Sequence, residues 1–119
     1  MRFTKLSDDG VIVRAQLAGR ITPKEVSAAY DPFTAELGEN AYTRRVSLDM
    51  SGAEYIDSSG ISWLLVAFNQ FRDKGGKLVM HSLTPIVSNT VRVLRMHLVF
   101  VVAANEFEAE KKLREGLHE

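Results

Sequence analysis

The sequence predicts a single α/β domain with a mixed, mostly parallel sheet, in the order β-β-α-β-α-β-α-β-α. Three observations support this fold class. Apolar runs of strand length alternate with segments of helical periodicity, an order typical of parallel strands joined by right-handed crossovers. Two strand segments joined by a tight turn open the chain, which adds an antiparallel hairpin. The 119 residues suffice for one compact domain, residues 1–119, and not for two.

The opening hairpin is predicted from a turn between two alternating segments. Phe3–Leu6 forms a short first strand, and Ser7-Asp8-Asp9-Gly10 is the turn, in which Asp-Gly supplies a positive φ. A second strand begins at Val11, where apolar and polar side chains alternate. It ends at Gly19-Arg20-Ile21.

A first helix is expected after this strand. Thr22-Pro23-Lys24-Glu25 combines an N-cap, a proline at the first helical position and a capping-box glutamate. Pro32 interrupts the helical stripe, so a break is expected near Asp31, where a short second piece could restart. Gly38 closes the region. Residues 45–50 then form the third strand, followed by a short loop.

The second half of the chain continues the alternation of helices and strands. An apolar stripe predicts a helix to about Asp73, ended by Gly75-Gly76, and Lys77–His81 is a fourth strand. Thr84-Pro85 begins another helix. The residues expected on its buried face are Ile86, Val87, Thr90, Val91 and Leu94. The run 98–102 has strand length, and Asn105, with Glu108 three residues later, caps a final helix through Leu113.

The composition favours a soluble, cytoplasmic protein. Hydrophobic residues make up 45% of the chain, and Lys+Arg and Asp+Glu both number 15, so the formal net charge is zero. Because no Lys/Arg cluster is present, nucleic acid is not expected as a partner. The absence of cysteine excludes disulfides, thiol catalysis and cysteine-ligated metal. No segment suggests direct membrane insertion or a signal peptide.

Enzymatic chemistry has no support in the sequence. Asp57-Ser58-Ser59-Gly60 differs from the Gly-x-Ser-x-Gly motif of serine hydrolases, and His81, His97 and His118 have no partner spacing, so ordinary surface or edge positions are expected for them. Gly75-Gly76-Lys77 lacks the other residues of a phosphate loop and precedes a strand. We therefore expect no catalytic residues, no metal and no cofactor.

Asp57-Ser58-Ser59-Gly60 stands where a strand passes into the most apolar helix. Small polar residues there can cap the first free N–H groups of the helix, which is a purely structural role. Alternatively, an exposed hydroxyl at the positive end of the helix could carry a phosphate that a partner recognises. The residues alone leave both alternatives open. Trp63, on the face opposite the apolar stripe, either packs against a neighbouring helix or anchors a partner.

With this element order and Asp57-Ser58-Ser59-Gly60 at the head of the second helix, the chain resembles the STAS domain family. Within that family it is most similar to bacterial anti-sigma factor antagonists. The segments that carry the resemblance are the hairpin ending at Gly19, Val46–Met50, Tyr55–Ile61, Gly75–Val79, and Thr84-Pro85 leading into Val91 and Leu94.

The resemblance implies a partner switch. An unphosphorylated antagonist binds an anti-sigma factor that is also a serine kinase, the kinase phosphorylates the antagonist and the complex dissociates, and a PP2C-type phosphatase resets the system. Carried over by position, the acceptor is Ser58, with Ser59 the weaker candidate. Asp57 would orient the loop, and Gly60 would let the partner backbone approach closely.

One position departs from the family pattern. Antagonists commonly have an acidic residue soon after the glycine that ends the second strand, and this chain has Thr22 in that place, so contacts with the kinase are expected to differ there.

The alternative function is a non-phosphorylated STAS scaffold subunit of a transporter or signalling complex. The doublet Ser58-Ser59 favours the switch, because a scaffold needs no hydroxyl there.

Overall fold

The computed structural model describes residues 1–22 and 31–115. The predicted helix start at Thr22-Pro23-Lys24-Glu25 lies outside these residues, except for Thr22 itself. The predicted break near Asp31 is confirmed, because a short helix begins at Pro32 with Asp31 as its N-cap. The Asp31 side chain accepts from the Thr34 amide at 3.2 Å.

One sheet of six strands forms the centre of the described chain, in the order β1-β2-β3-β5-β6, with β4 pairing the end of β2. The β1–β2 pair is antiparallel and every other pair is parallel, which confirms the predicted mixed sheet with an opening hairpin. Gly10 in the hairpin turn has the expected positive φ of 90°. The strands are β1 (Arg2–Asp8), β2 (Ile12–Ile21), β3 (Arg45–Asp49), β4 (Ala53–Ile56), β5 (Lys77–His81) and β6 (Val102–Ala103).

The helices between these strands begin and end at the residues that favour such positions. Asp57, Thr84 and Asn105 each cap a helix with the side chain, and a left-handed Gly75 ends the longest one. The helices are α1 (Pro32–Leu37), α2 (Ser58–Lys74), α3 (Pro85–Val93) and α4 (Glu106–Arg114), with 3-10 turns η1 (Ala41–Thr43) and η2 (Met96–Leu98).

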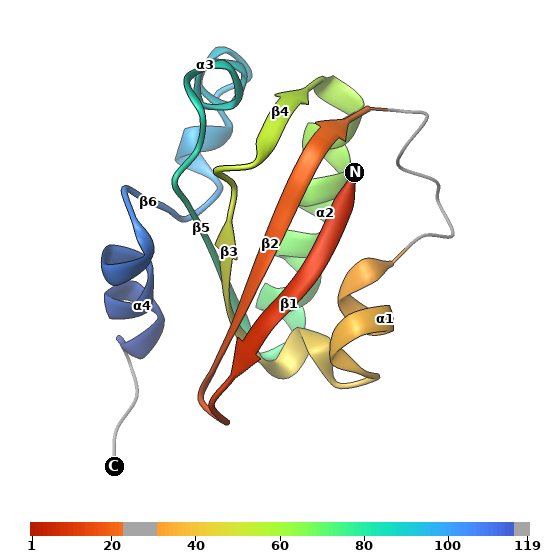
Figure 1. Cartoon of the computed structure of the whole chain (residues 1–119), viewed down its shortest axis with the longest axis vertical. Coiled ribbons are helices and arrows are strands. Elements are labelled where there is room, and N and C mark those ends of the chain that lie inside the picture. The colour runs from red at the N-terminus through yellow and green to blue at the C-terminus, as the bar shows by residue number, and fades with distance from the viewer. Residues whose placement is uncertain (23–30, 116–119) are drawn as a thin grey trace.

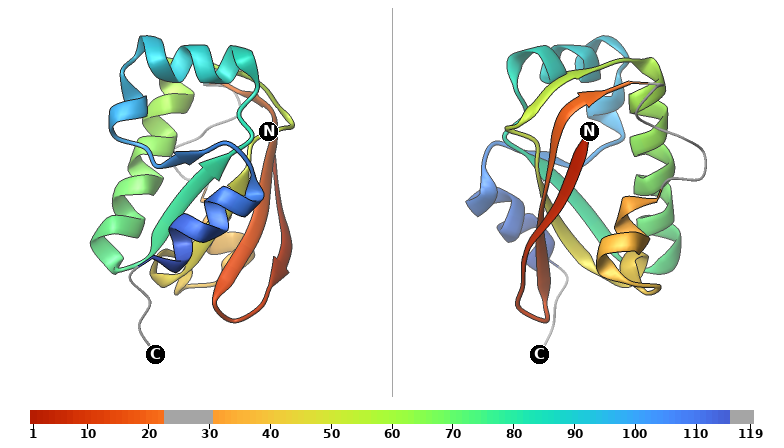
Figure 2. Two further views of the ribbon diagram at one scale, coloured as in Figure 1. Left: turned by 90° about the vertical axis from the view of Figure 1, so that its left-hand side faces the viewer. Right: turned by 45° about the vertical axis from the view of Figure 1, so that its right-hand side comes forward.

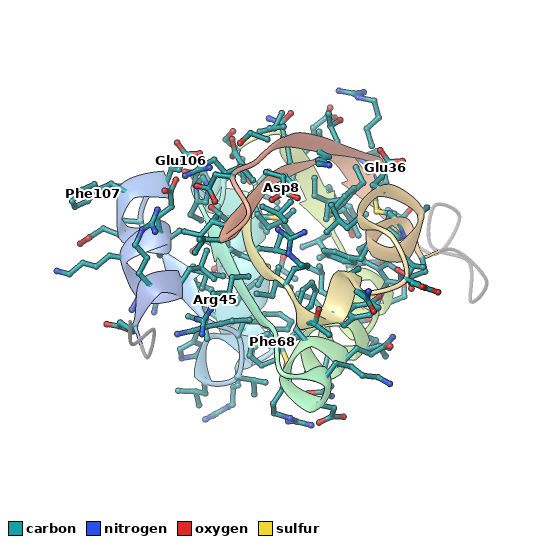
Figure 3. All side chains as sticks on the ribbon, turned by 90° about the horizontal axis from the view of Figure 1, so that it is seen from below. Asp8, Glu36, Arg45, Phe68, Glu106 and Phe107 are labelled. Atoms are coloured by element: carbon teal, nitrogen blue, oxygen red, sulfur yellow. The ribbon has the colours of Figure 1, made fainter. Side chains whose placement is uncertain are left out.

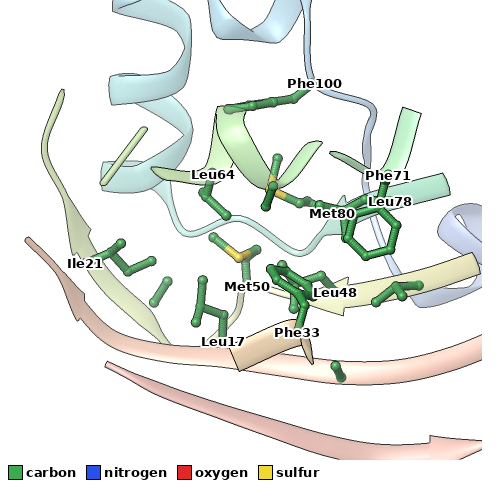
Figure 4. Close-up of a cluster of buried hydrophobic side chains, with 14 of the residues drawn as sticks. Leu17, Ile21, Phe33, Leu48, Met50, Leu64, Phe71, Leu78, Met80 and Phe100 are labelled. Atoms are coloured by element: carbon green, nitrogen blue, oxygen red, sulfur yellow. The ribbon is translucent and has the colours of Figure 1, made fainter. Parts of the chain in front are cut away.

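Helices cover both faces of the sheet (Figure 1). α1, α2 and α3 contribute to one large apolar cluster with the strands, in which Phe33 contacts Phe71 edge-to-face at a centroid distance of 5.3 Å (Figure 4). α4 lies on the opposite face and buries Ala109 and Leu113 against a smaller cluster. Because both faces are covered, the polar Ser47 of β3 is buried as well, at 1% exposure.

Polar contacts from the sheet hold α4 in place. The Arg14 guanidinium donates to both carboxylate oxygens of Glu110, at 2.8 and 2.6 Å. Arg45 donates to the carbonyl of Leu113 at 2.5 Å and Lys77 donates to the carbonyl of Lys112 at 2.7 Å. These two cations therefore satisfy free carbonyls in the last turn of α4, where the helix dipole favours positive charge. Figure 3 shows Arg45 beside this helix.

The sequence does not predict β4, because it indicates only a short loop between the third strand and the following helix. In the structure, β4 pairs in parallel with the end of β2, through Gly19↔Ala53 and Ile21↔Ile56. The strand is four residues long and buries only its ends, Ala53 and Ile56. So short a segment has no alternating pattern, and its partner lies more than thirty residues away, so only the tertiary fold identifies it.

The predicted strand 98–102 is wrong over most of its length. Arg95 adopts a left-handed φ of 61°, and the chain then forms η2, with the Phe100 amide donating to the Met96 carbonyl at 2.8 Å. Leu98 is 72% exposed. Only Val102–Ala103 reaches the edge of β5 and pairs with it.

The predicted buried face of the third helix is also partly wrong. Val87 and Val91 are buried, as expected, whereas Ile86 is 58% exposed and Leu94 is exposed beyond the end of α3. α3 packs against the short β4, and the Thr84 hydroxyl donates to the Ala53 carbonyl at 3.0 Å. Within α3, the buried residues are Val87 and Val91.

The β1–β2 hairpin is fastened by an ion pair that should weaken in acid. Both Asp8 oxygens contact Arg44, at 2.6 and 3.0 Å, and this hydrogen bonding, with that from the Gly10 amide, lowers the pKa of Asp8 to about 2. Because the pKa is depressed, the stabilisation is present above about pH 4 and disappears as the pH falls through 2. We expect Asp8→Asn to lose about 0.5–1 kcal/mol of unfolding free energy at pH 7, a value reduced by solvent screening.

The measurement is urea denaturation at pH 7 and at pH 2.5. The expected result is that Asp8→Asn and the wild type differ less at pH 2.5 than at pH 7. Asp73→Asn is the matched control, because the pair of Asp73 with Arg72 is 63% and 64% exposed. A deficit of Asp8→Asn that is as large at pH 2.5 as at pH 7 would contradict the prediction.

Candidate functional site

The N-terminus of α2 lies at the carboxyl ends of two paired strands. Ile21 ends β2, Ile56 ends β4, and the two residues are in register. The Asp57 amide donates to the Ile21 carbonyl at 3.4 Å, which extends the pairing by one step. Thr22 and Asp57 are the next residues on the two chain segments, so the structure brings the half-buried Thr22 to the start of α2, as the family resemblance implies.

Asp57 is the N-cap of α2 and organises its first turn. One carboxylate oxygen accepts from the Ser59 amide at 3.1 Å, the Gly60 amide at 3.0 Å and the Ser59 hydroxyl at 2.7 Å. The hydrogen bond from the Ser59 hydroxyl, followed by that from the Gly60 amide, lowers the pKa of Asp57. The carboxylate is therefore ionised at neutral pH, and the predicted capping role is confirmed.

The two serines that follow differ in environment. Ser58 is the first residue of α2 and is exposed, and its hydroxyl has no hydrogen-bond partner among the described residues. Ser59 is half-buried, and its hydroxyl donates to Asp57. Of the two hydroxyls, only that of Ser58 is thus free to react, and it lies at the positive end of a 17-residue helix.

Gly60 has an internal role in packing. It is buried, and a Cβ at this position would lie 2.8 Å from side-chain carbons of both Ile21 and Ile56, and closer still to the Ile21 carbonyl oxygen. The absence of a side chain therefore lets α2 approach the ends of β2 and β4. The expectation that Gly60 gives access to the backbone of a partner has no support in this geometry, because the space beside its Cα is already filled.

Trp63 lies one turn into α2 and packs against the neighbouring helix. Its ring is stacked on that of Phe33, with centroids 6.3 Å apart and planes 29° apart, and the side chain is half-buried against the core. Of the two alternatives for Trp63, the structure shows the packing contact. A contact with a partner through the rest of the ring stays a prediction.

The exposed side of α2 carries residues that were not predicted to belong to the site. Ser62 and Val66 follow Ser58 at intervals of four, so the three residues form one stripe on the solvent side of the helix. Ser62 donates to the Ser58 carbonyl at 3.0 Å. Beside the helix start, the Arg20 guanidinium lies 4.6 Å from the centre of the Tyr55 ring. The i, i+4 spacing could have identified the stripe, but the Arg20–Tyr55 contact depends on β4.

Within residues 1–22 and 31–115, the histidine and acidic side chains do not cluster into a metal site. No group of three His, Asp or Glu side chains is placed to hold a metal ion. His97 is on the surface, as expected, and His118 lies outside the described residues. The expectation for His81 is wrong: it is 3% exposed, and its Nδ1 is 2.8 Å from the Ser82 hydroxyl. Its strand lies between β3 and β6, under α4, which explains the burial.

Among the described helices, none is long and apolar enough to cross a bilayer.

Comparison with known proteins adds to this geometry. The family model "Mlab, STAS domain" matches residues 4–102. BtrV of Bordetella bronchiseptica, named as an anti-sigma factor antagonist, is 26% identical over 117 residues, which are 98% of this chain and 98% of BtrV.

Solved structures of three related proteins have the same architecture. An anti-sigma factor antagonist from Mycobacterium paratuberculosis superposes with a TM-score of 0.73 at 16% identity, over 96% of each chain. A STAS domain protein from Planctomyces limnophilus gives 0.70 at 20% identity, over 96% of this chain and 97% of its own. The antagonist SpoIIAA in its unphosphorylated form gives 0.69 at 16% identity, over 98% and 100%. At these identities the likeness establishes a common fold.

Proposed function

Because this chain belongs to the STAS domain family, we propose that it is an anti-sigma factor antagonist whose binding to an anti-sigma factor is switched by phosphorylation of Ser58. The observation that carries the proposal is the contrast between the two serines. The Ser58 hydroxyl is exposed and has no partner within the described residues, whereas the Ser59 hydroxyl is held by Asp57. A kinase can reach the first without breaking a hydrogen bond.

The start of α2 can accept a phosphate without refolding. A phosphoserine adds about −1.5 to −2 charges at neutral pH. The positive end of a helix stabilises such a charge by about 0.3–1 kcal/mol at an exposed position. The ionised carboxylate of the adjacent Asp57 opposes it. Because the attraction of the helix end and the repulsion from Asp57 oppose each other, the phosphate should change the fold of the domain little. It acts at the surface instead, where it repels a bound partner and blocks it sterically.

The partner in this proposal is an anti-sigma factor with serine-kinase activity, and a PP2C-type phosphatase restores the unphosphorylated form. The contact surface is the start of α2, with Asp57, Ser58, Ser59 and the adjacent Thr22. Trp63 contributes its exposed edge. The chain supplies the acceptor hydroxyl and no catalysis, and it works in the cytoplasm, where sigma factors act.

The test is to map phosphate on protein purified from the organism that encodes it. Intact mass with and without phosphatase, followed by peptide mapping of residues 46–72, is expected to place one phosphate on Ser58. Ser58→Ala should remove it, and Ser59→Ala is the matched control that should retain it, because the Ser59 hydroxyl is engaged with Asp57. A phosphate on Ser59 would preserve the switch and correct the site. Absence of phosphate under every growth condition, and with a cognate kinase supplied, would favour the scaffold function instead.

A further inference from the structure

A cavity of about 620 Å³ is lined by residues of α3, η2, β6 and α4. Figure 2 (left) shows these elements on the side of the molecule that faces the viewer. Its volume falls within the range typical of small-molecule sites. Ser58 is not part of its lining. The cavity is therefore separate from the start of α2, and a ligand bound there would add a function beyond the proposed switch.

Part of the cavity lining is apolar. Leu83, Val101 and Val102 are half-buried and present apolar surface to the hollow, whereas Val91, Phe100 and Ala103 are only 3%, 5% and 6% exposed and belong to the packed interior. The Phe100 ring packs edge-to-face on Phe68 of α2, with centroids 5.8 Å apart. This apolar part of the lining offers a preformed surface for the apolar body of a ligand.

The outer rim of the same cavity is basic. Arg92 of α3, His97 of η2 and Lys112 of α4 line it, together with the hydroxyl-bearing Ser88, and no acidic residue does. Neither the Arg92 guanidinium nor the Lys112 ammonium forms an ion pair or hydrogen bond with the described residues. This contrasts with Arg14, Arg45 and Lys77, which are bound to Glu110 or to carbonyls of α4. Two cationic residues from separate elements, neither paired with an acidic side chain among the described residues, therefore line the same hollow.

We propose that this cavity binds a small organic anion, with an apolar body against Leu83, Val101 and Val102 and a phosphate or carboxylate group held by Arg92 and Lys112. The guanidinium and the ammonium would donate charge-assisted hydrogen bonds to the anionic group, and the His97 ring and Ser88 hydroxyl would complete its environment. A neutral ligand could not accept these charge-assisted hydrogen bonds, so the charge of the ligand should decide its affinity.

The test is an NMR titration of the whole protein with phenyl phosphate, benzoate and phenol. These probes share an aromatic body and differ in charge. Phenyl phosphate or benzoate is expected to shift the backbone amides of Val91, His97 and Ala103, and to bind at least about tenfold more tightly than phenol. The anionic probe that binds more tightly identifies the preferred head group. Inorganic phosphate, which lacks the apolar body, should bind more weakly than phenyl phosphate.

Matched variants separate this site from general attraction to positive charge. Arg92→Gln and Lys112→Gln should each weaken binding of phenyl phosphate by roughly 5- to 10-fold. Arg95→Gln and Lys111→Gln remove cations next along the same segments that do not line the cavity, and should leave the affinity unchanged. Thermal unfolding of each variant checks that it is folded.

Three results would overturn the proposal. The first is the absence of shifts at the lining amides with either anionic probe. The second is binding of phenol as tight as that of phenyl phosphate. The third is an equal loss of affinity in the Arg95→Gln and Arg92→Gln variants, which would show attraction to the surface and no defined site.

Discussion

Phosphate on Ser58 is expected to weaken binding of the anti-sigma factor by about 100-fold or more. Such a change corresponds to about 2.7 kcal/mol of binding free energy. A doubly charged group placed at an interface supplies that amount, because it must be desolvated beside the ionised Asp57 and because its bulk separates the two surfaces.

The measurement is calorimetric titration of the anti-sigma factor encoded in the same genome with each form of this protein. Ser58→Ala should bind as the unphosphorylated wild type does and should lose no affinity after incubation with the kinase and ATP. Ser59→Ala is the control and should still be switched off by the kinase. Equal affinity of the phosphorylated and unphosphorylated wild type would refute the switch, even if Ser58 carries phosphate in cells.

Gly60→Ala is expected to lower the unfolding free energy by about 2 kcal/mol or more. The added methyl group would overlap the Ile21 carbonyl oxygen and approach side-chain carbons of Ile21 and Ile56 to 2.8 Å. The carbonyl belongs to the backbone and accepts from the Asp57 amide, so it cannot move away without breaking the junction of β2 and α2. Overpacking of this kind costs about 3 kcal/mol, offset by about 1 kcal/mol from the better helix propensity of alanine.

Thermal unfolding followed by circular dichroism should show this loss as a fall of roughly 10 °C in Tm. Ser62→Ala, two residues further along the same helix and exposed, is the matched control and should change the stability by less than about 0.5 kcal/mol. Because the overlap pushes the first turn of α2 away from the strands, phosphorylation of Ser58 should also slow in Gly60→Ala. A Gly60→Ala protein as stable as Ser62→Ala would contradict the packing role of this glycine.

The helix boundaries could be predicted because they depend on residues close together in the chain. Asp31 before Pro32, Thr84 before Pro85 and Asn105 all cap helices as expected, and each accepts a hydrogen bond from an amide three residues on. β3 is predicted from the alternation of Val46, Leu48 and Met50 with Ser47 and Asp49, and β5 from the apolar residues that follow Gly75-Gly76. Caps and strand patterns that involve only neighbouring residues can be recognised in the sequence without knowledge of the tertiary fold.

The errors have a common cause in contacts between distant residues. β4 exists because the end of β2 offers it a partner, and Ile86 is exposed because β4 and η2, against which α3 packs, leave that side of the helix uncovered. The apolar run 98–102 was divided between η2 and β6 because only its end reaches the edge of β5. For α3 and the run 98–102 the pattern is apolar, but the number of neighbours that can cover it is set elsewhere in the chain.

The candidate site shows the same division. That Asp57 caps a helix, and that two hydroxyls follow it, can be read from four consecutive residues, because an N-cap needs only a short side-chain oxygen and the next amides. The difference between the hydroxyls depends on the folded chain, in which Ser59 turns toward Asp57 and Ser58 faces solvent. The role of Gly60 likewise arises because Ile21 lies against the helix. Local hydrogen bonds are encoded within a few residues, whereas exposure and close packing depend on which strands meet.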